Sequence, residues 1–238
     1  MQRALTRRIA LLLVIGLAVF ATAGCGGSDG EATDASPAPA AAPPATPPPP
    51  ATDGPAQCSD VEAPAPREDG GAQAPEERLD PEVTHALRFE TSCGAFTVTL
   101  DLESAPATSA SLVALAKAGF YDATVFHRIA PGFVIQGGDP TATGSGGPGY
   151  QTVDAPAEDA AYVKGVVAMA KTGAEAPGTA GSQFFVVTGD DIGLPPDYAV
   201  VGAVTEGLEV VELIGTKGDP ATELPTQPIV VDRVVASP

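Results

Sequence analysis

The sequence predicts a mostly β domain, an antiparallel barrel or sandwich that carries two helices, and three observations support this prediction. Short apolar runs rich in Val, Ile and Phe recur between residues 83 and 238, each bounded by Gly, Pro or Asp, and this pattern is typical of strands. Only two stretches have the spacing of helices. Because helices and strands do not alternate regularly, a parallel sheet with crossover helices is disfavoured.

The predicted strands follow one another at short intervals. They cover residues 86–90, 95–100, 125–129, 163–170, 183–187, 199–204 and 229–235. The first two are joined by a turn at Ser92-Cys93-Gly94, which indicates a hairpin. Residues 126–139 form the densest segment, and they predict a strand, a turn at Ala130-Pro131-Gly132 and a second strand.

The two predicted helices have clear ends. The first covers residues 107–118, begins after Pro106 and stops at Gly119. The second covers residues 208–214 and is followed by Gly215. Proline at the start and glycine past the end are the expected helix boundaries.

The chain is strongly acidic. It has 238 residues with 12 Lys and Arg against 30 Asp and Glu, a formal net charge of −18 at pH 7. Such a chain is repelled by phosphate backbones, so we expect no nucleic-acid partner. Two His and three Cys supply few ligands for a metal cage, so no metal site is expected.

The first 24 residues have the layout of an export signal. Three Arg side chains precede an apolar run, residues 9–23, that ends in small residues. The run leads to Cys25 through Thr22-Ala23-Gly24, which resembles a bacterial lipobox, although Leu is usual where Thr22 stands. The sequence therefore predicts an exported protein with a lipid on Cys25, held at the cell membrane and facing outside the cytoplasm. The alternative is an ordinary cleaved signal with Cys25 nearby by chance.

Residues 25–82 predict a disordered tether. The stretch 36–50 is almost entirely Ala and Pro, and Val61 and Leu79 are the only large aliphatic residues of the segment. Ordering it would bury little apolar surface to offset the lost entropy. We therefore expect three parts: the signal, this tether, and one domain that covers residues 83–238.

Cys58 and Cys93 remain if Cys25 carries a lipid. An oxidising compartment outside the cytoplasm favours a disulfide bond between them. Such a bond would fix the end of the tether to the first hairpin. Two free thiols are the alternative.

Two familiar kinds of site are disfavoured. Residues 144–149 satisfy the spacing G-x-G-x-x-G, but Tyr150-Gln151-Thr152 does not begin a helix, so a flexible loop is expected instead of a dinucleotide site. No Ser or Cys stands at a turn typical of a nucleophile, so a hydrolytic triad lacks its first member.

Segment 126–139 brings chemistry-bearing side chains together. Alternation puts Arg128 on the face of Phe126, and beyond the turn Phe133 and Gln136 can return to that side. The residues alone leave two interpretations open. One is a site made of an arginine, an amide and an aromatic ring; the other is Arg128 as a solvated surface charge.

Segment 126–139 resembles the signature of the cyclophilin family of peptidyl-prolyl isomerases. Met169-Ala170 followed by residues 181–185 resembles the second signature of that family, and residues 120–122 and 202–208 also fit in order. The resemblance covers about residues 84–235. It implies a closed eight-stranded antiparallel β-barrel capped by two helices, and an isomerase that needs no cofactor.

The resemblance also implies roles for individual residues. Arg128 matches the catalytic arginine, Phe133 and Phe185 match the aromatic residues of the proline pocket, and Gln136 and Gln183 match polar residues that hold the substrate. The remaining substrate-binding positions are His127, Val134, Ala170, Lys171, Leu194 and Tyr198. His127 is also expected to act as a hydrogen-bonded structural residue, and Phe184 is expected to point into the core.

The chain departs from the family pattern at three places. Lys171 stands where many members have Asn, and the loop 171–181 is longer than in short members. No Trp occupies the pocket position near Gly193, so weak cyclosporin binding is expected.

The implied partners are Pro-containing polypeptides, among them unfolded exported proteins, and a monomer is expected. The alternative function is a non-catalytic chaperone or scaffold that only binds Pro-containing peptides at the cell envelope. Intact Arg128 favours the isomerase, because binding alone does not need a cation at the prolyl nitrogen.

Overall fold

A computed structural model of the chain describes residues 57–238. The predicted signal 1–24, the predicted lipid site Cys25 and the first part of the predicted tether lie outside these residues. In the part that is described, no helix is both long enough and apolar enough to cross a membrane.

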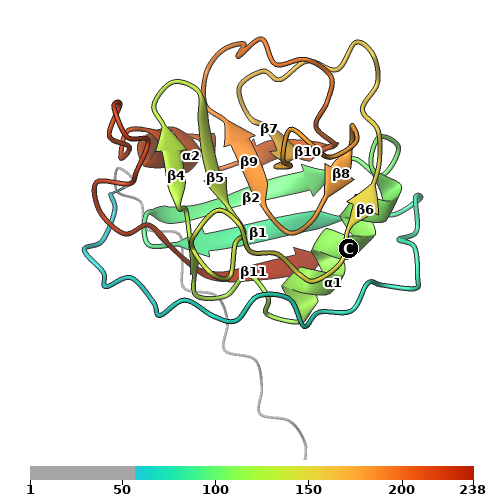
Figure 1. Ribbon diagram of the computed structural model, residues 1–238, viewed down its shortest axis with the longest axis horizontal. Coiled ribbons are helices and arrows are strands. Elements are labelled where there is room, and N and C mark those ends of the chain that lie inside the picture. Colours follow the sequence, from blue (N-terminus) through green and yellow to red (C-terminus); the bar gives the residue numbers. More distant parts are fainter. Residues whose placement is uncertain (1–56) are drawn as a thin grey trace, which may run out of the picture. The chain divides into compact units, whose positions relative to one another are not determined.

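Nine antiparallel strands form one sheet that curls into a half-barrel (Figure 1). Their order across the sheet is β3-β11-β1-β2-β10-β7-β9-β5-β4, and a separate small sheet pairs β6 with β8. The strands are β1 (Ala86–Thr91), β2 (Gly94–Leu100), β3 (Thr124–Val125), β4 (Arg128–Ala130), β5 (Val134–Gly137), β6 (Thr152–Val153), β7 (Val166–Met169), β8 (Thr179–Ala180), β9 (Phe184–Val187), β10 (Val200–Glu206) and β11 (Val230–Ser237).

The predicted closed barrel of eight strands is corrected in two respects. Among residues 57–238 the main sheet has nine strands, and it keeps two edges, β3 and β4. The extra strand arises because the predicted run 125–129 changes partner: Val125 pairs with Val230, whereas Arg128 pairs with Gln136. An isolated bridge joins Val125 of β3 to Asp139, which lies just beyond the end of β5.

The two helices agree with the prediction to within one residue at each end. They are α1 (Pro106–Lys117) and α2 (Leu208–Gly215). The N-cap residue Ala105 has no side chain that could cap the first turn of α1; instead the carboxylate of Asp154 accepts hydrogen bonds from the Thr108 backbone N–H at 2.7 Å and from its hydroxyl at 2.6 Å. The N-cap of α2 is Gly207, where φ is 75° and a Cβ would lie 2.3 Å from the Ala95 carbonyl oxygen, so glycine is required.

Alternation along β9 separates the core from the outer face of the sheet. Phe184 is 2% exposed and lies in the core, with its ring centroid 5.1 Å from Phe89 and 6.1 Å from Phe126. The predicted orientation of Phe184 is therefore confirmed. Phe185, the next residue, faces the other side and belongs to a separate apolar cluster.

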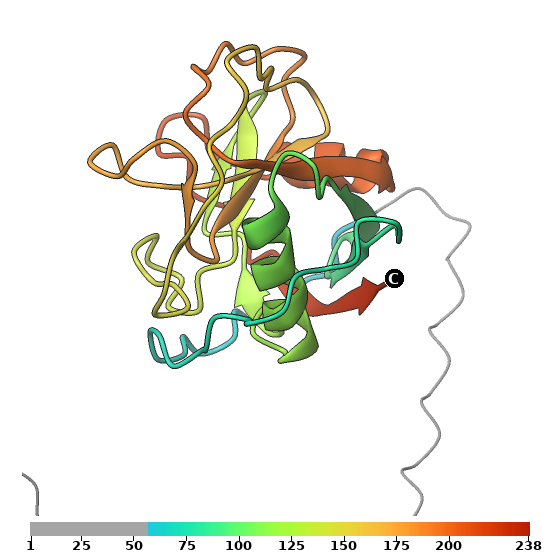
Figure 2. The same cartoon turned by 90° about the vertical axis from the view of Figure 1, so that its right-hand side faces the viewer.

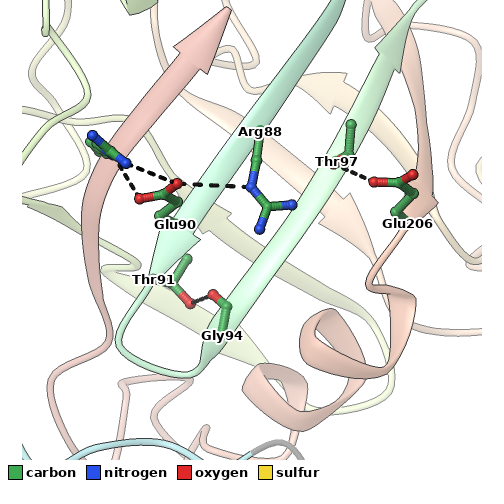
Figure 3. A network of polar contacts seen from close by, with 7 residues as sticks. Arg88, Glu90, Thr91, Gly94, Thr97 and Glu206 are labelled. Carbon is green, nitrogen blue, oxygen red and sulfur yellow. Dashed lines mark hydrogen bonds and ion pairs between the residues drawn. The ribbon is translucent and has the colours of Figure 1, made fainter. Parts of the chain in front are cut away.

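Polar side chains connect neighbouring strands on the solvent side of β1 and β2 (Figure 3). Glu90 accepts hydrogen bonds from Arg233 on β11 at 2.6 and 3.2 Å, and Arg88 lies 3.8 Å from the same carboxylate. Thr97 on β2 donates to Glu206 at 3.1 Å. Each exposed contact is weak, but together they link β11, β1, β2 and β10.

Residues 57–82, which we call the strap, lie against the domain. Cys58 and Cys93 form a disulfide bond, and the Ser59 N–H donates to the Ser92 carbonyl at 2.7 Å. The strap then runs along the lower side of the view in Figure 1 and crosses α1 in Figure 2. Leu79 packs against the core. The strap therefore differs from the disordered tether that its composition predicts up to residue 82. A covalent bond and backbone hydrogen bonds hold this segment although it has little apolar surface.

Candidate active site

Four residues on adjacent strands form a row across the outer face of the sheet. Arg128 on β4 is paired with Gln136 on β5, Gln136 with Phe185 on β9, and Phe185 with Ala168 on β7. Directly paired residues point to the same face of a sheet. The register therefore places a guanidinium, an amide and an aromatic ring side by side, so the predicted return of Gln136 to the side of Arg128 is confirmed. The prediction that Arg128 shares a face with Phe126 is wrong: Phe126 lies in the core, because the chain changes partner between β3 and β4 and simple alternation is interrupted there.

An apolar cluster surrounds the aromatic end of this row. Val134 and Phe185 are buried in it, 2% and 5% exposed. The rings of Phe185 and Tyr198 meet edge to face with centroids 5.5 Å apart. Partly buried side chains complete the cluster, among them Phe133, Ala170, Ile192 and Leu194. The cluster is thus an apolar surface beside a fixed cation, and it unites six of the predicted site residues.

Hydrogen bonds link the polar side chains of the row. An Arg128 guanidinium N–H donates to Gln136 Oε1 at 3.4 Å, and the Gln136 amide donates to Gln183 Oε1 at 3.1 Å. The Gln183 amide in turn donates to the Gly146 carbonyl at 2.9 Å. This series of hydrogen bonds fixes the direction in which each amide presents its donor and its acceptor.

Glu223 holds Arg128 from the other side. The Arg128 Nε–H donates to Glu223 Oε2 at 2.6 Å, and the Ile129 N–H donates to the Glu223 carbonyl at 2.8 Å. The guanidinium also lies over the Phe133 ring, 5.8 Å from its centroid. Because Nε is occupied, the outer N–H groups of Arg128 remain to donate elsewhere.

A cavity of about 620 Å³ lies beside the polar end of the row. Gln136, Gln183, Ala170 and the glycine-rich loop 144–149 line it, together with Asp69 from the strap. The element that follows this loop is β6, so no helix begins there and the predicted loop is confirmed.

Asp139 shapes the loop beside this cavity. Its buried carboxylate accepts hydrogen bonds from the backbone N–H groups of Thr141, Gly144 and Gly146 at 2.7, 2.6 and 3.2 Å. Burial by itself raises a carboxyl pKa, but the hydrogen bonds outweigh burial and hold the pKa of Asp139 below its ordinary value. The ionised carboxylate is therefore a structural part of the loop.

Comparison with known proteins places this geometry in a family. Residues 86–236 match the family described as cyclophilin type peptidyl-prolyl cis-trans isomerase/CLD. The chain belongs to this family. The matched region contains the row, the apolar cluster and Glu223, while the strap precedes it.

Curated relatives are named peptidyl-prolyl cis-trans isomerases. Peptidyl-prolyl cis-trans isomerase A of Mycobacterium tuberculosis is 36% identical over 175 residues, 66% of this chain and 94% of the relative. Peptidyl-prolyl cis-trans isomerase ppi1 of Schizosaccharomyces pombe is 36% identical over 154 residues, 63% of this chain and 97% of the relative. The Mycobacterium leprae protein named "Probable peptidyl-prolyl cis-trans isomerase A" is 43% identical over 121 residues, and the chain spans 65% of its length.

Solved cyclophilins share the fold. A crystal structure of a cyclophilin type peptidyl-prolyl cis-trans isomerase from Cryptosporidium parvum superposes with a TM-score of 0.60 at 29% identity, covering 66% of this chain and 99% of the other. A second structure of that protein, in the presence of the dipeptide Ala-Pro, gives a TM-score of 0.59 at 29% identity, covering 64% and 99%.

Lys171 does not offer a free cation to the site of this cyclophilin. Its side chain is 2% exposed, and Nζ lies 2.5 Å from the Asp197 carboxylate. Nζ also donates to the Glu175 carbonyl at 3.2 Å and lies 5.5 Å from the centroid of the Tyr198 ring. The ion pair neutralises the charge of Lys171, so only its backbone is left to meet a substrate.

The expectation of a hydrogen-bonded His127 is wrong. Both ring nitrogens are buried, and neither has a hydrogen-bond partner among residues 57–238. Burial lowers the pKa of His127, nearby Asp139 opposes this shift, and Arg128 reinforces it. The ring lies beside the loop glycine Gly144, where a Cβ would meet it at 3.7 Å. His127 therefore packs as a neutral ring under the loop.

Tyr162 and Glu223 are site residues that the sequence analysis missed. The Tyr162 hydroxyl donates to the Tyr198 carbonyl at 2.7 Å and accepts from the Tyr198 N–H at 3.0 Å, so it fixes one wall of the apolar cluster. Burial raises the pKa of Tyr162. Glu223 is 95 positions from Arg128 in the sequence. Neither residue lies in a family motif, and no local pattern points to either.

The described residues contain no group of three or more His, Cys, Asp or Glu side chains that could hold a metal ion.

Proposed function

We propose that this cyclophilin accelerates the cis–trans rotation of X-Pro bonds in exported polypeptides, with Arg128 hydrogen-bonding the prolyl nitrogen. The observation that carries the proposal is the position of Arg128 beside an apolar cluster on one sheet face. The cluster supplies apolar surface for a proline ring, and the guanidinium lies at its edge.

The physical basis is the loss of amide resonance during rotation. The barrier of about 18–20 kcal/mol arises because resonance gives the C–N bond partial double-bond character. In the twisted state the prolyl nitrogen becomes pyramidal and regains a lone pair, which accepts a hydrogen bond. A permanently charged guanidinium is a strong donor to that lone pair. Donors aimed at the rotating carbonyl add electrostatic stabilisation, and the Gln136 amide is the candidate.

The Glu223 contact sharpens this role for Arg128. A long arginine side chain has many rotamers, and holding it in the one that reaches the prolyl nitrogen costs conformational entropy. The bond from Nε to Glu223 and the contact with the Phe133 ring restrict Arg128 without a substrate. Preorganised donors lower a barrier because they do not reorganise during the reaction.

The substrate class and location complete the proposal. The Cryptosporidium parvum relative solved with Ala-Pro supports Pro-containing peptides as ligands of this chain. The signal-like residues 1–24, the lipobox-like Cys25 and the Cys58–Cys93 disulfide support export to an oxidising compartment, with a lipid anchor at the membrane. We propose that the protein acts there as a monomer on unfolded chains, and that it binds cyclosporin weakly.

The test is catalysed exchange of an X-Pro peptide, compared between the parent chain and Arg128→Ala. We expect kcat/KM to fall about a hundredfold in the variant, while peptide binding measured by calorimetry persists. Arg128→Lys is the matched control, because it keeps the charge but loses the planar fork of donors; it should recover only a small part of the rate. Binding without acceleration in the parent chain would instead identify a proline-binding chaperone or scaffold.

A further inference from the structure

The strap contacts the candidate active site although it lies outside the matched family region. Asp69 Oδ1 accepts a hydrogen bond from the Gly147 N–H at 2.7 Å. Gly70 N–H donates to the Gly147 carbonyl and Ala72 N–H to the Pro148 carbonyl, both at 3.0 Å. Strap residues 69–72 thus pair with the loop that lines the cavity.

This pairing is a close approach of two backbones. Gly149 has a φ of 91°, and a Cβ at this position would lie 3.2 Å from the Gly70 Cα and 3.3 Å from the Gly71 nitrogen. Glycines on both sides allow the strap to lie directly on the loop. The strap therefore limits how far the loop can move outward.

The loop passes this restraint to the catalytic row. Gly146, next to Gly147, accepts the hydrogen bond from the Gln183 amide at 2.9 Å. Gln183 in turn accepts from Gln136, and Gln136 accepts from Arg128. Asp69 is thus connected to the row through the loop residues 146 and 147, and it also lines the cavity itself.

Two attachments on the domain hold the strap in place. At one end Cys58 is bonded to Cys93, which is 1% exposed in the core. Nearer to Asp69, Arg67 donates from its guanidinium to the Phe120 carbonyl and lies 5.8 Å from the Phe120 ring centroid. A closed covalent loop restricts the conformations of the segment that it contains. The disulfide therefore increases the fraction of time that residues 69–72 are in contact with the loop 144–149.

We propose that the strap is a working part of the substrate site, in which Asp69 is a positioning residue and the Cys58–Cys93 disulfide keeps it in position. Asp69 fixes the loop 144–149, and the loop fixes the Gln183 amide for binding the substrate backbone. The inference rests on the proposed isomerase function. Since the Gln183 amide holds the peptide in the ground state and the transition state alike, losing the strap raises KM and leaves kcat unchanged.

The first test compares three variants of the full chain. Asp69→Ala removes the acceptor for the Gly147 N–H and should raise KM for an X-Pro tetrapeptide about fivefold. Asp69→Asn keeps an acceptor oxygen and should retain a KM near the parent value. Glu68→Ala removes the same charge from the exposed neighbour and should behave as the parent. A loss shared by Glu68→Ala, or a loss in kcat at constant KM, overturns the proposal.

The second test addresses the disulfide. Cys58→Ala detaches the strap while Cys93 stays in the core, and it should raise KM in the same direction as Asp69→Ala. Combined with Asp69→Ala it should add little, because both changes release the same contact. Fully additive effects would show that the disulfide acts elsewhere and would overturn its part of the inference.

A third measurement separates this inference from the proposed function. Hydrogen exchange of the Gly147 amide and the side-chain NMR signals of Gln183 need no catalysis. Asp69→Ala should speed the exchange about fivefold and shift the Gln183 signals, whereas Glu68→Ala should change neither. If the parent chain lacks isomerase activity but shows these changes, the proposed function fails and the positioning role stands. Unchanged exchange in Asp69→Ala overturns the positioning role even if the enzyme is active.

Discussion

The two halves of the candidate site are built in different ways. The apolar half stands on the paired strands β5, β7 and β9, whose register places Phe185 opposite Gln136 and Ala168. The polar cavity takes Gln136 from β5 but is otherwise lined by residues outside the strands, among them the loop 144–149 and Asp69 of the strap. Strand register fixes side chains through a continuous hydrogen-bond ladder, whereas the loop depends on a few individual contacts. We therefore call the apolar half, where we propose that proline binds, the rigid half, and the cavity with its loop the adjustable half.

The largest expected effect tests the rigid half. Phe185→Ala removes a buried ring from the apolar cluster and should lower the free energy of unfolding by about 3 kcal/mol. It should also raise KM for X-Pro peptides, because the proline ring loses its apolar partner. Urea unfolding and steady-state kinetics measure the two effects, with Phe185→Leu as the control that keeps most of the volume. If Phe185→Ala unfolds like the parent, the cluster is not the rigid unit described above.

The next effect tests what holds the adjustable half. Asp139→Asn replaces a carboxylate that accepts from several N–H groups by an amide that carries its own donors. We expect a loss of about 2 kcal/mol in unfolding free energy, with the largest rise in hydrogen exchange at residues 141–146. Equal exchange in all parts of the domain would contradict a local role for Asp139.

The same carboxylate predicts a pH dependence. The pKa of Asp139 is lower in the folded chain than in the unfolded one. Its contribution to stability is therefore complete above the unfolded value of about 3.9 and is lost as pH falls through the lower folded value. Unfolding midpoints measured from pH 6 downward should fall less steeply for Asp139→Asn than for the parent, since the variant has no such proton to gain. Parallel curves would show that Asp139 is not the group that titrates.

A smaller effect is expected from the contact between Glu223 and Arg128, which lies beside both halves of the site. Glu223→Gln keeps an acceptor for the Arg128 Nε–H but removes the charge that strengthens this bond. We expect kcat to fall about tenfold, from a loss of charge-assisted bonding, with KM unchanged because the apolar cluster is untouched. Glu223→Asp should not restore the rate, since the shorter side chain cannot reach Nε with the same geometry. Glu158→Gln, an exposed glutamate distant from Arg128 in sequence, serves as the control for charge alone.

The sequence predicts the rigid half better than the adjustable one for a physical reason. Period-two alternation is a local property, so the opposite directions of Phe184 and Phe185 can be derived from neighbouring residues. It fails for Phe126 and Arg128, because the chain changes partner between β3 and β4. The approach of Glu223 to Arg128 depends instead on how distant segments meet, and no local pattern carries that information. The motifs of the family supply most of the remaining site residues, because they mark positions rather than contacts.

The strap is a second case in which the sequence does not predict long-range contacts. Its composition predicts disorder, since it offers almost no large apolar side chains for burial. The structure holds it by backbone hydrogen bonds at residues 67, 70 and 72 and by one disulfide bond. Backbone donors and acceptors are the same for every residue except proline, so composition does not reveal where they pair. A prediction from composition therefore underestimates order wherever main-chain contacts and a covalent bond act together.

The smallest expected effect concerns the charge of the cavity. Asp69 and Glu175 line it with carboxylates, while the cation of Lys171 is already paired with Asp197. A hydrogen bond from the Thr172 N–H keeps the pKa of Glu175 below its ordinary value, so this group is ionised at neutral pH. A cationic side chain near the proline of a substrate should therefore bind better than an anionic one.

Peptides in which Lys, Ala or Glu is moved along the positions on either side of the proline test this charge preference. We expect kcat/KM to fall in the order Lys, Ala, Glu at one position, by about twofold per step at low ionic strength, as for exposed ion pairs. The difference should shrink as added salt shortens the screening length to about 10 Å at 0.1 M and less beyond. Asp69→Asn should reduce the preference without changing KM for the Ala peptide, because it removes the charge but keeps the contact with Gly147. The same order in Asp69→Asn at full size would assign the preference to Glu175 and leave the strap with its positioning role alone.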